Sequence, residues 1–431
     1  MKYLLYKRIC LSVTLLCCVA VQAQWTLIED LKSDTYYTSL AFNKSNVPYI
    51  LHGQGSSYRT TVQKLENNTW QTVGNPQFSN NPVFYPKLAI ANNGTVYTAF
   101  SEWSAGYPGP ISVMKFDGTA WIYVGNRFMT PSASNVLSLA TDSSSIPYIA
   151  IHERGDLNKL SVMKFTGVAW EYVGTHSFSP RNASYVSLAF DRLNNLYVAF
   201  KDSANKASVM KYDGAIWSVL GSFGLSAGTV YYETPLAIDR NNVPYVAYTD
   251  MANGNKATVK KFDGTQWMNA GPAAFSSTQA YNVQLVISGN NVPYVGYKNS
   301  ASASKATVMK LEGGTWSVVG AEAFTPNPFL SLSLAVNKYG TPHIATDSGS
   351  VRIFKYVNPP YKFIGSGNWK DPANWSNNLV PPDTLPGDYS IIIDPAQGEC
   401  ILNGTVTISA GASLMVQPGK RFIVNGSVII L

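Results

Sequence analysis

Few side chains in this sequence have the spacing of a catalytic or metal-binding motif. Four histidines are spread along the chain: His52, His152, His176 and His343. None of them has a cysteine or another histidine at the spacing of a metal site. The sequence also carries no activated-serine elbow and no phosphate-binding glycine loop. We therefore predict no catalytic residues, no metal site and no cofactor.

Carboxylates offer the one enzymatic alternative. A pair of acids that flanks a glycosidic bond can cleave it when their separation is right. The candidates are acids in non-repeating loops: Glu102, Glu153, Asp202, Glu233 and Asp250. Their separation depends on the elements that position them.

A phrase of 13 residues recurs along the chain and defines its period. Its clearest copy is Val113–Gly125, in which Asp117-Gly118 separates two apolar runs and a tryptophan begins the second run. The copies place a tryptophan at Trp70, Trp121, Trp170, Trp217, Trp267 and Trp316, at intervals of 51, 49, 47, 50 and 49 residues. A constant period near 50 is typical of a repeat architecture.

Each repeat contains four short strand-like runs bounded by turn residues. In the repeat that begins at Leu236, the runs are 236–238, 243–248, 257–262 and 266–270. Three residues before every signature tryptophan stands Gly or Asn, which accept the positive φ of a tight hairpin. A unit of four antiparallel strands and about 50 residues has the size of one propeller blade.

The number of blades follows from counting the runs. The phrase that holds the first and second runs occurs seven times, at Leu40, Leu88, Leu139, Leu188, Leu236, Leu285 and Leu334. The tryptophan run follows only six of these phrases, and its seventh copy, Trp25–Ile28, stands near the start of the chain. We therefore predict an all-β fold in which residues 24–357 form a seven-bladed β-propeller. Its N-terminal strand completes the last blade and covers an otherwise open edge.

Residue types that repeat in every blade are assigned to packing and turns. A lysine stands six residues before each signature tryptophan, and its stem can cover an aromatic ring on the adjacent strand. A ring of these lysines that binds an anionic polymer is the alternative. An aromatic column is expected to fill the space between blades: Tyr49, Tyr97, Tyr148, Tyr197, Tyr245 and Tyr294, with His343 in the seventh copy.

Non-repeating residues gather on one face of the predicted propeller. In an antiparallel meander, the loops between second and third strands share a face with the links between blades, and binding commonly uses such variable loops. They are rich in Tyr, Trp, Ser and Asn, which hydrogen-bond hydroxyl groups and stack on sugar rings. The predicted ligand-binding residues are Tyr37, Tyr58, Tyr85, Trp103, Tyr107, His152, Glu153, Arg154, Tyr185, Lys201, Asp202, Tyr232 and Asp250.

The first 23 residues have the pattern of an export signal. Three basic residues precede the apolar run 9–21, and small residues follow at a cleavage position. The run is too short to span a membrane, and a lipoprotein signal at Cys17 or Cys18 is the alternative. Cleavage would leave Cys400 as the sole cysteine, so no intramolecular disulfide could form. We predict a protein that is secreted or held on the outer cell surface, with the periplasm as a further location.

The charge of the chain is mildly basic. Its formal net charge of +7 falls to +4 when the three basic residues of the signal are removed. Lysine and arginine are scattered rather than clustered, so we predict no nucleic-acid partner.

Residues 358–431 follow a different pattern. A segment rich in Trp, Asn and Pro, 365–386, precedes short apolar runs that Gly and Asn separate. We predict a separate β module of solenoid or sandwich type. Asn368–Ser376, with Pro381-Pro382 after it, resembles a segment that recurs in large surface proteins of Gram-negative bacteria, which implies a surface location.

The propeller part is similar to bacterial secreted propeller-repeat proteins of the kelch-like and Asp-box-like kind. The resemblance rests on the turn-then-tryptophan pattern at blade period. Asp117–Trp121 is shorter than an Asp-box, and the double glycine of kelch repeats occurs only at Gly313-Gly314. No functional residue of either family is therefore carried over.

These observations predict an exported binding protein. Its variable face would recognise a carbohydrate or a surface protein. A polysaccharide-degrading enzyme, either a glycoside hydrolase or a lyase, with its site on the same face is the alternative.

Overall fold

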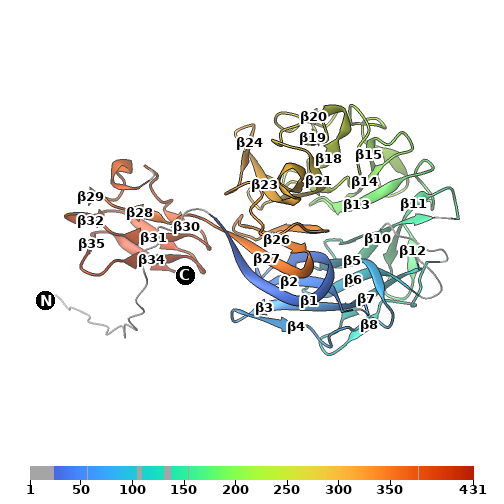
Figure 1. Cartoon of the computed structure of the whole chain (residues 1–431), viewed down its shortest axis with the longest axis horizontal. Helices are drawn as coiled ribbons and strands as arrows, with labels where there is room; N and C mark the ends of the chain where they lie inside the picture. Colours follow the sequence, from blue (N-terminus) through green and yellow to red (C-terminus); the bar gives the residue numbers. More distant parts are fainter. Residues whose placement is uncertain (1–23, 56, 104–108, 131–136, 154, 377) are drawn as a thin grey trace. The chain divides into compact units, whose positions relative to one another are not determined.

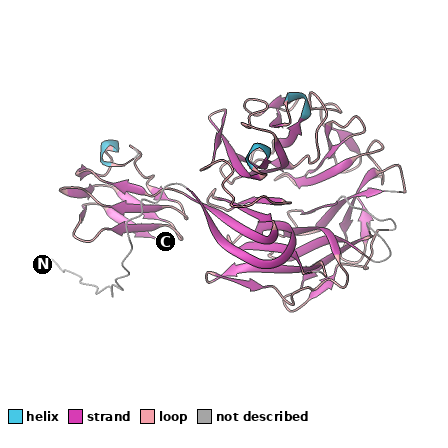
Figure 2. Cartoon of the chain, viewed as in Figure 1, coloured by secondary structure: helices cyan, strands magenta, loops and turns pink. Residues whose placement is uncertain are grey.

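The computed structural model describes residues 24–431 except 56, 104–108, 131–136, 154 and 377. The expected export signal, 1–23, lies outside them. Figure 2 shows that strands dominate both parts of the chain, with short helical turns at η1 (Met251–Asn253), η2 (Ser300–Ser302) and η3 (Pro372–Asn374). The chain divides into a propeller body, Trp25–Val357 with Pro386–Asp388, and a C-terminal body, Asn358–Leu385 with Tyr389–Leu431. The prediction of an all-β chain is confirmed.

The propeller body contains five antiparallel sheets of four strands each. We call them the second to sixth units. They consist of β5 (Val83–Ile90), β6 (Val96–Glu102), β7 (Ile111–Phe116) and β8 (Trp121–Tyr123); β9 (Leu137–Thr141), β10 (Pro147–Glu153), β11 (Lys159–Phe165) and β12 (Trp170–Tyr172); β13 (Ser184–Phe190), β14 (Leu196–Lys201), β15 (Ala207–Tyr212) and β16 (Trp217–Val219); β17 (Leu236–Ile238), β18 (Pro244–Asp250), β19 (Lys256–Phe262) and β20 (Trp267–Asn269); β21 (Ala280–Ile287), β22 (Pro293–Asn299), β23 (Lys305–Glu312) and β24 (Thr315–Val318). Their first strands lie against each other in chain order, from β5 through β9, β13 and β17 to β21.

The remaining strands of this body form one sheet of seven. Its order is β25 (Leu332–Val336), β26 (Pro342–Asp347), β27 (Gly349–Val357), β1 (Gln24–Phe42), β2 (Pro48–Gln54), β3 (Arg59–Glu66) and β4 (Thr69–Thr72). In Figure 1 the N-terminal strand, in blue, runs beside orange β27. The 19-residue β1 therefore serves two four-strand units. Its second half begins the first unit, and its first half is the fourth strand of a seventh unit with β25, β26 and β27.

Signature tryptophans tie each unit to the one before it. The indole N–H of Trp121 donates to the Val73 carbonyl over 2.7 Å. The same bond recurs from Trp170 to Val124, Trp217 to Val173, Trp267 to Leu220 and Trp316 to Ala270. Trp25 donates to Val319 in the same way, over 2.8 Å. The N-terminal tryptophan thus makes the bond of a seventh signature residue.

A glycine four residues after each internal tryptophan lets the chain leave the fourth strand. Gly125 has a φ of +73°, and a Cβ there would lie 3.1 Å from Cδ1 of Trp170 in the next unit. Glu29 occupies this position after Trp25. Because no glycine interrupts it, the strand continues straight into the first unit. The joint between the seventh and first units differs accordingly, since the indole N–H of Trp70 is buried without a partner.

The repeated lysines and tyrosines face each other within each unit. Strand register places Tyr49 opposite Lys64, and the pairs Tyr97–Lys115, Tyr148–Lys164, Tyr197–Lys211, Tyr245–Lys261, Tyr294–Lys310 and His343–Lys355 follow. The Lys211 ammonium lies 5.3 Å from the centre of the Tyr197 ring. The packing role predicted for both columns agrees with this register.

The C-terminal body is built from three separate sheets of parallel strands. Its three sheets are β28 (Tyr361–Phe363), β31 (Ser390–Ile393) and β34 (Ser413–Val416); β29 (Gly367–Asn368), β32 (Glu399–Leu402) and β35 (Arg421–Val424); and β30 (Thr384–Leu385), β33 (Thr405–Ile408) and β36 (Ser427–Ile430). Ile391 pairs with Leu414, and Cys400 with Phe422, so the second turn of the chain takes 22 or 23 residues. The first turn is longer on two of the three sheets, since Tyr361 pairs with Ile391 and Gly367 with Cys400. Parallel strands that recur once per turn on three sheets are the arrangement of a solenoid rather than of a sandwich. Phe363, Trp369 and Trp375 fill its core.

Candidate functional site

Serine hydroxyls join the first strands of neighbouring units. Leu88 donates its backbone N–H to the Ser39 hydroxyl over 3.2 Å. The same bond runs from Leu188 to Ser138, from Leu236 to Ser187 and from Leu40 to Ser333, over 2.9–3.1 Å. Each serine stands one residue before the leucine that begins the repeated phrase.

The repeat is broken at three of these positions. Lys87, Pro235 and Gln284 stand where the other units have serine. None of them can supply a serine hydroxyl, so the bond to the next unit is given up at each. All three line one cavity of about 470 Å³, which Ser138 and Ser187 also line while they keep the bond. Because the three departures from the packing repeat all lie at this cavity, we identify it as the candidate functional site.

A bulge in the first strand directs tyrosines towards the cavity. Strand register shifts between Phe84 and Lys87 and again between Ser184 and Ser187. Inside these bulges Tyr85 and Tyr185 have φ values of +51° and +53°. Bulges re-aim side chains, and both tyrosines line the cavity.

The corresponding position in the fifth unit carries Glu233 instead of a tyrosine. The cavity is lined by Tyr85, Lys87, Leu88, Ser138, Leu139, His152, Ser184, Tyr185, Val186, Ser187, Glu233, Thr234, Pro235 and Gln284. Its volume lies in the range of small-ligand sites, and its wall mixes apolar surface with a few polar groups, as such sites do.

Enclosure shifts the pKa of both charged groups in the cavity. Burial raises the pKa of the Glu233 carboxyl, while the attraction of Lys87 and Lys298 opposes the shift only in part. The Lys87 side chain is exposed at the cavity, and desolvation lowers its pKa while the attraction of Glu233 opposes the shift. Among the described residues, Lys87 and Glu233 form no direct ion pair. Each charge is therefore left for a ligand to compensate.

Two aromatic clusters extend from the cavity over separate units. The first aromatic cluster contains Tyr37, Phe84, Tyr85 and Trp103, with ring centres 5.7–6.3 Å apart. Tyr36 and Tyr58 form a pair with ring centres 5.1 Å apart. The second aromatic cluster contains Tyr185, Tyr231, Tyr232 and Tyr281, with centres 4.0–5.3 Å apart. Trp103 is 50% exposed and Tyr232 40% exposed. Tyr85 and Tyr185 connect the two clusters to the cavity.

The structure brings several of the sequence-predicted residues together at this site. Tyr85, Tyr185 and His152 line the cavity, and the first and second clusters hold Tyr37, Trp103 and Tyr232. Tyr58 pairs with Tyr36. The Lys201 ammonium lies 5.8 Å from the Tyr185 ring centre and donates to the Tyr231 carbonyl over 3.1 Å. Tyr107 and Arg154 lie outside the described residues.

The predicted acids are engaged in bonds within their own units. Glu153 accepts from the Tyr172 hydroxyl over 3.2 Å. Asp202 accepts from the Lys206 N–H and from the Ser208 hydroxyl, and so holds a loop. Asp250 accepts from the Asn253 amide and the Thr258 hydroxyl, but its other oxygen, Oδ1, is buried without a partner.

Glu102, the remaining loop acid, is also held within its unit. It is completely buried and bound by Arg127, whose Nη2 lies 2.6 Å from a carboxylate oxygen.

Sequence reasoning left Lys87 and Gln284 out of the predicted site, and considered Glu233 only as a catalytic carboxylate. The signal that identifies them was present in the sequence. Aligned on the repeated leucine, the preceding residues read Ser39, Lys87, Ser138, Ser187, Pro235, Gln284 and Ser333. The departures from serine pick out the cavity.

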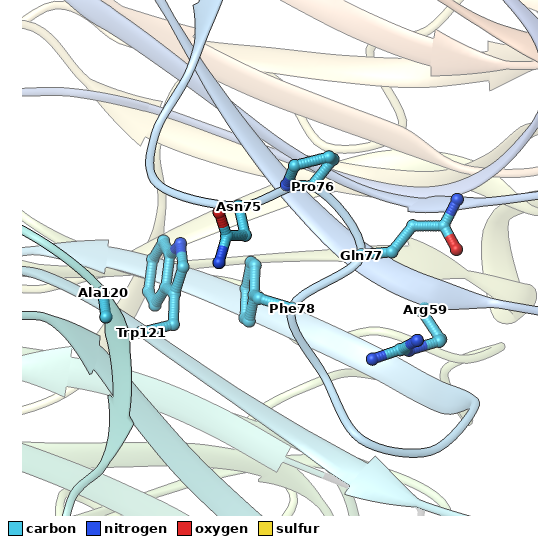
Figure 3. A pocket seen from close by; sticks show the side chains of 7 residues that line it. All are labelled: Arg59, Asn75, Pro76, Gln77, Phe78, Ala120 and Trp121. Carbon is cyan, nitrogen blue, oxygen red and sulfur yellow. The ribbon is translucent and has the colours of Figure 1, made fainter.

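A second hollow, shown in Figure 3, lies between the first and second units and has a volume of about 500 Å³. Trp121 stacks on Phe78 there, with ring centres 4.1 Å apart. The same stack recurs for Phe178–Trp217 and Phe275–Trp316. Arg59 donates to the Ser79 carbonyl. Because the stack is a contact that several joints between units share, we assign this hollow to the scaffold.

No metal-binding cluster and no membrane-spanning helix occur in the described part of the chain. No group of three His, Cys, Asp or Glu side chains there is placed to hold an ion. No helix there is long and apolar enough to cross a membrane.

Comparison with known proteins identifies the fold but not a family. No family model and no curated protein matches the sequence. An ulvan lyase solved with bound -[GlcA(1-4)Rha3S]- superposes with a TM-score of 0.53 and 10% identity, over 77% of this chain and 96% of the lyase. A protein of unknown function from Dyadobacter fermentans gives 0.45 and 12%, over 64% and 94%. The Aleuria aurantia lectin with Fucalpha1-6GlcNAc gives 0.43 and 14%, over 68% and 99%. At such identities the likeness concerns the fold alone. The kelch-like and Asp-box-like resemblance stays a prediction.

Proposed function

We propose that this chain is an exported binding protein that holds a carbohydrate at the cavity lined by Lys87 and Glu233. The observation that carries the proposal is the loss of the serine bond at three positions that surround one cavity. The protein gives up scaffold contacts there and gains a lysine and a carboxyl group that form no direct ion pair among the described residues, an amide and two tyrosines. Hydroxyl-rich ligands match such a mixture of hydrogen-bonding groups and aromatic faces.

The fold supports this proposal in a limited way. The ulvan lyase that shares the fold is a polysaccharide lyase bound to a saccharide. A shared fold does not transfer a function, so the argument depends on the residues of this chain. A surface protein is the other partner class that an exposed aromatic face fits, and it is the competing outcome of the test.

Degradation of a polysaccharide is the second candidate function. The pKa of the Glu233 carboxyl is raised and the pKa of the Lys87 amine is lowered, so both pKa values move towards neutral pH. Both groups line the same cavity. Groups with such pKa values can exchange protons with a substrate. The tyrosine Tyr185 lines the same cavity and is a third candidate proton donor.

A glycan array with the mature protein tests the binding proposal. We expect bound glycans whose signal falls at least tenfold in Tyr185→Ala and Glu233→Gln, and is unchanged in Glu171→Gln, an exposed acid on β12. Capture of no glycan, together with a specific protein partner from culture fluid, would overturn it. Shortened products from any bound polymer, absent with Glu233→Gln, would establish the enzyme instead.

We further propose that the seven four-strand units form one closed ring behind an export signal at 1–23, with residues 358–431 displaying or anchoring it. Three contacts support closure. Trp25 bonds to Val319 of the sixth unit, Ser333 accepts from Leu40, and Lys338 donates its backbone N–H to the Asn46 side chain over 2.8 Å. Each contact repeats one that other neighbouring units make.

A further inference from the structure

We infer that the ligand is an extended acidic polysaccharide, laid across the cavity with an anionic group at Lys87 and its neighbouring sugars on the two aromatic clusters. This inference rests on the proposed function and adds the charge and the length of the ligand. The anionic group is a carboxylate or a sulfate, which share the chemistry that an ammonium recognises.

The cavity lining contains one lysine, Lys87, and one acid, Glu233. Lys87 makes no hydrogen bond or ion pair within the described part of the chain. Outside the lining, Lys298 is attracted by both Asp347 and Glu233, and burial lowers its pKa as well. Lys87 is therefore the lysine of the lining that an anionic group of a ligand would pair with.

The nearby Asp347 carries a negative charge, but its oxygens are occupied by hydrogen bonds and do not accept from a ligand. Oδ1 accepts the Ser331 N–H over 2.6 Å and the Leu330 N–H over 3.2 Å. Oδ2 accepts the Tyr37 N–H and the Ser331 hydroxyl, over 2.9 and 2.8 Å. Asp347 thus holds the first strand of the first unit against the seventh. Lys87, which has no such bonds, is the charged group of this side that lines the cavity.

Glu233 restricts which anionic ligands the cavity can bind. Its carboxylate accepts its own backbone N–H, and no side chain donates to it within the described residues. A carboxylate that bears a raised pKa accepts readily from hydroxyl groups and repels a second anion close by. A sugar that places its acidic group on the Lys87 side and a hydroxyl on the Glu233 side satisfies both charges.

The aromatic clusters determine the length of the ligand. A cavity of about 470 Å³ encloses only a small part of a polymer. Tyr85 leads from it to the first cluster over the first and second units, and Tyr185 leads to the second cluster over the fourth to sixth units. Of the two clusters only Tyr85 and Tyr185 line the cavity itself, so a ligand that also stacks on the remaining rings must extend beyond it. A chain that contacts both gains from each additional stacked ring.

The charge requirement is tested with one backbone in three forms: dextran, carboxymethyl dextran and dextran sulfate. We expect the full mature protein to bind at least one charged form at least tenfold more tightly than dextran. Lys87→Gln should remove that preference. Lys115→Gln is the matched control, because Lys115 lies in the same unit and pairs with Tyr97 away from the cavity. The charged form that binds identifies the anion as carboxylate or sulfate.

The length requirement is tested with oligogalacturonates of two to twelve residues. Affinity should rise steeply with length and then level off. Trp103→Ala and Tyr231→Ala, one from each cluster, should each weaken binding of long oligomers about tenfold and leave the dimer unchanged. Phe223→Ala is the control, since Phe223 is exposed and belongs to neither cluster.

The outcomes separate this inference from the proposed function. Equal binding of dextran and its charged forms, lost in Tyr185→Ala, would overturn the acidic ligand and leave a carbohydrate-binding cavity standing. Affinity that is independent of length would overturn the extended ligand. Lys87→Gln and Lys115→Gln with the same effect would mean that general positive charge binds the polymers, and the site would be wrong. A protein that binds no saccharide in any format would overturn the proposed function itself.

Discussion

The Glu233 carboxyl contributes to stability in a pH-dependent way. Burial raises its pKa in the folded state. Such a group favours the folded state most below its unfolded pKa, near 4.3, and this contribution is lost as pH rises through the folded pKa. We therefore expect Glu233→Gln to raise the melting temperature at pH 8 and to leave it unchanged at pH 4. Thermal unfolding at both pH values, with Glu171→Gln as the control, measures the effect. A shift of the same size at both pH values would contradict it.

Gly125 shows how one residue fits a joint between units. An alanine there would adopt a strained φ near +73° and would press its Cβ against Trp170 and Phe165, at 3.1 and 3.2 Å. We expect Gly125→Ala to lower the free energy of unfolding by about 2–4 kcal/mol. The matched control is Gly254→Ala, because Gly254 has a φ of +72° and open space around its Cβ position. Urea denaturation that gives equal losses for the two would show that the contact with Trp170 contributes nothing.

At the level of elements, the N-terminal half of β1 should decide whether the seventh unit is stable. Trp25 stacks on Phe324 with ring centres 4.2 Å apart, and its N–H is bonded to Val319. The Thr35 hydroxyl accepts the Val351 N–H over 2.7 Å, as Ser79 and Ser276 do for their own units. We expect Trp25→Ala to cost about 2–4 kcal/mol of unfolding free energy. Removal of Trp25–Leu31 should cost at least as much.

Chemical denaturation of both variants tests this role of β1. Trp103→Ala serves as the control, because this tryptophan is half exposed. A truncated protein that unfolds at the same urea concentration as the mature chain would show that the strand does not complete the sheet.

The strands could be predicted from the sequence where a local residue pattern, such as the tryptophan run, determines them. Trp25 was assigned to the last unit from its sequence alone, because the tryptophan run is short and its spacing constant. The continuation of β1 through two units was not predicted, since it depends on Glu29 replacing a glycine. The cavity was also missed in part. Lys87 and Glu233 are distant in sequence, and only the arrangement of first strands brings them to one space. Variable loops, which drew attention first, proved to hold several acids in structural bonds.

At the scale of the whole molecule, the two bodies are expected to fold independently. The propeller body and the C-terminal body each have a core of their own, and the latter is centred on Phe363, Trp369 and Trp375. We expect residues 24–357, expressed alone, to remain soluble and to melt within about 5 °C of the mature protein. Circular dichroism and thermal unfolding provide the measurement. An unfolded or insoluble product would place the C-terminal residues in the core of the propeller body.

The shared strand β1 also has a consequence for biogenesis. Trp25 and its acceptor Val319 are 294 positions apart, and Asp30 and its partner Arg352 are 322 apart. The first strand to leave the ribosome must therefore wait for nearly the last part of the propeller body. At about 5–20 residues per second, that interval is roughly 15–60 s. Throughout it the strand is an unpaired apolar edge, open to proteases and to other chains. Because the N-terminal half of β1 completes the seventh unit, the nascent chain depends on a chaperone to shield this strand until synthesis of the propeller body is nearly finished.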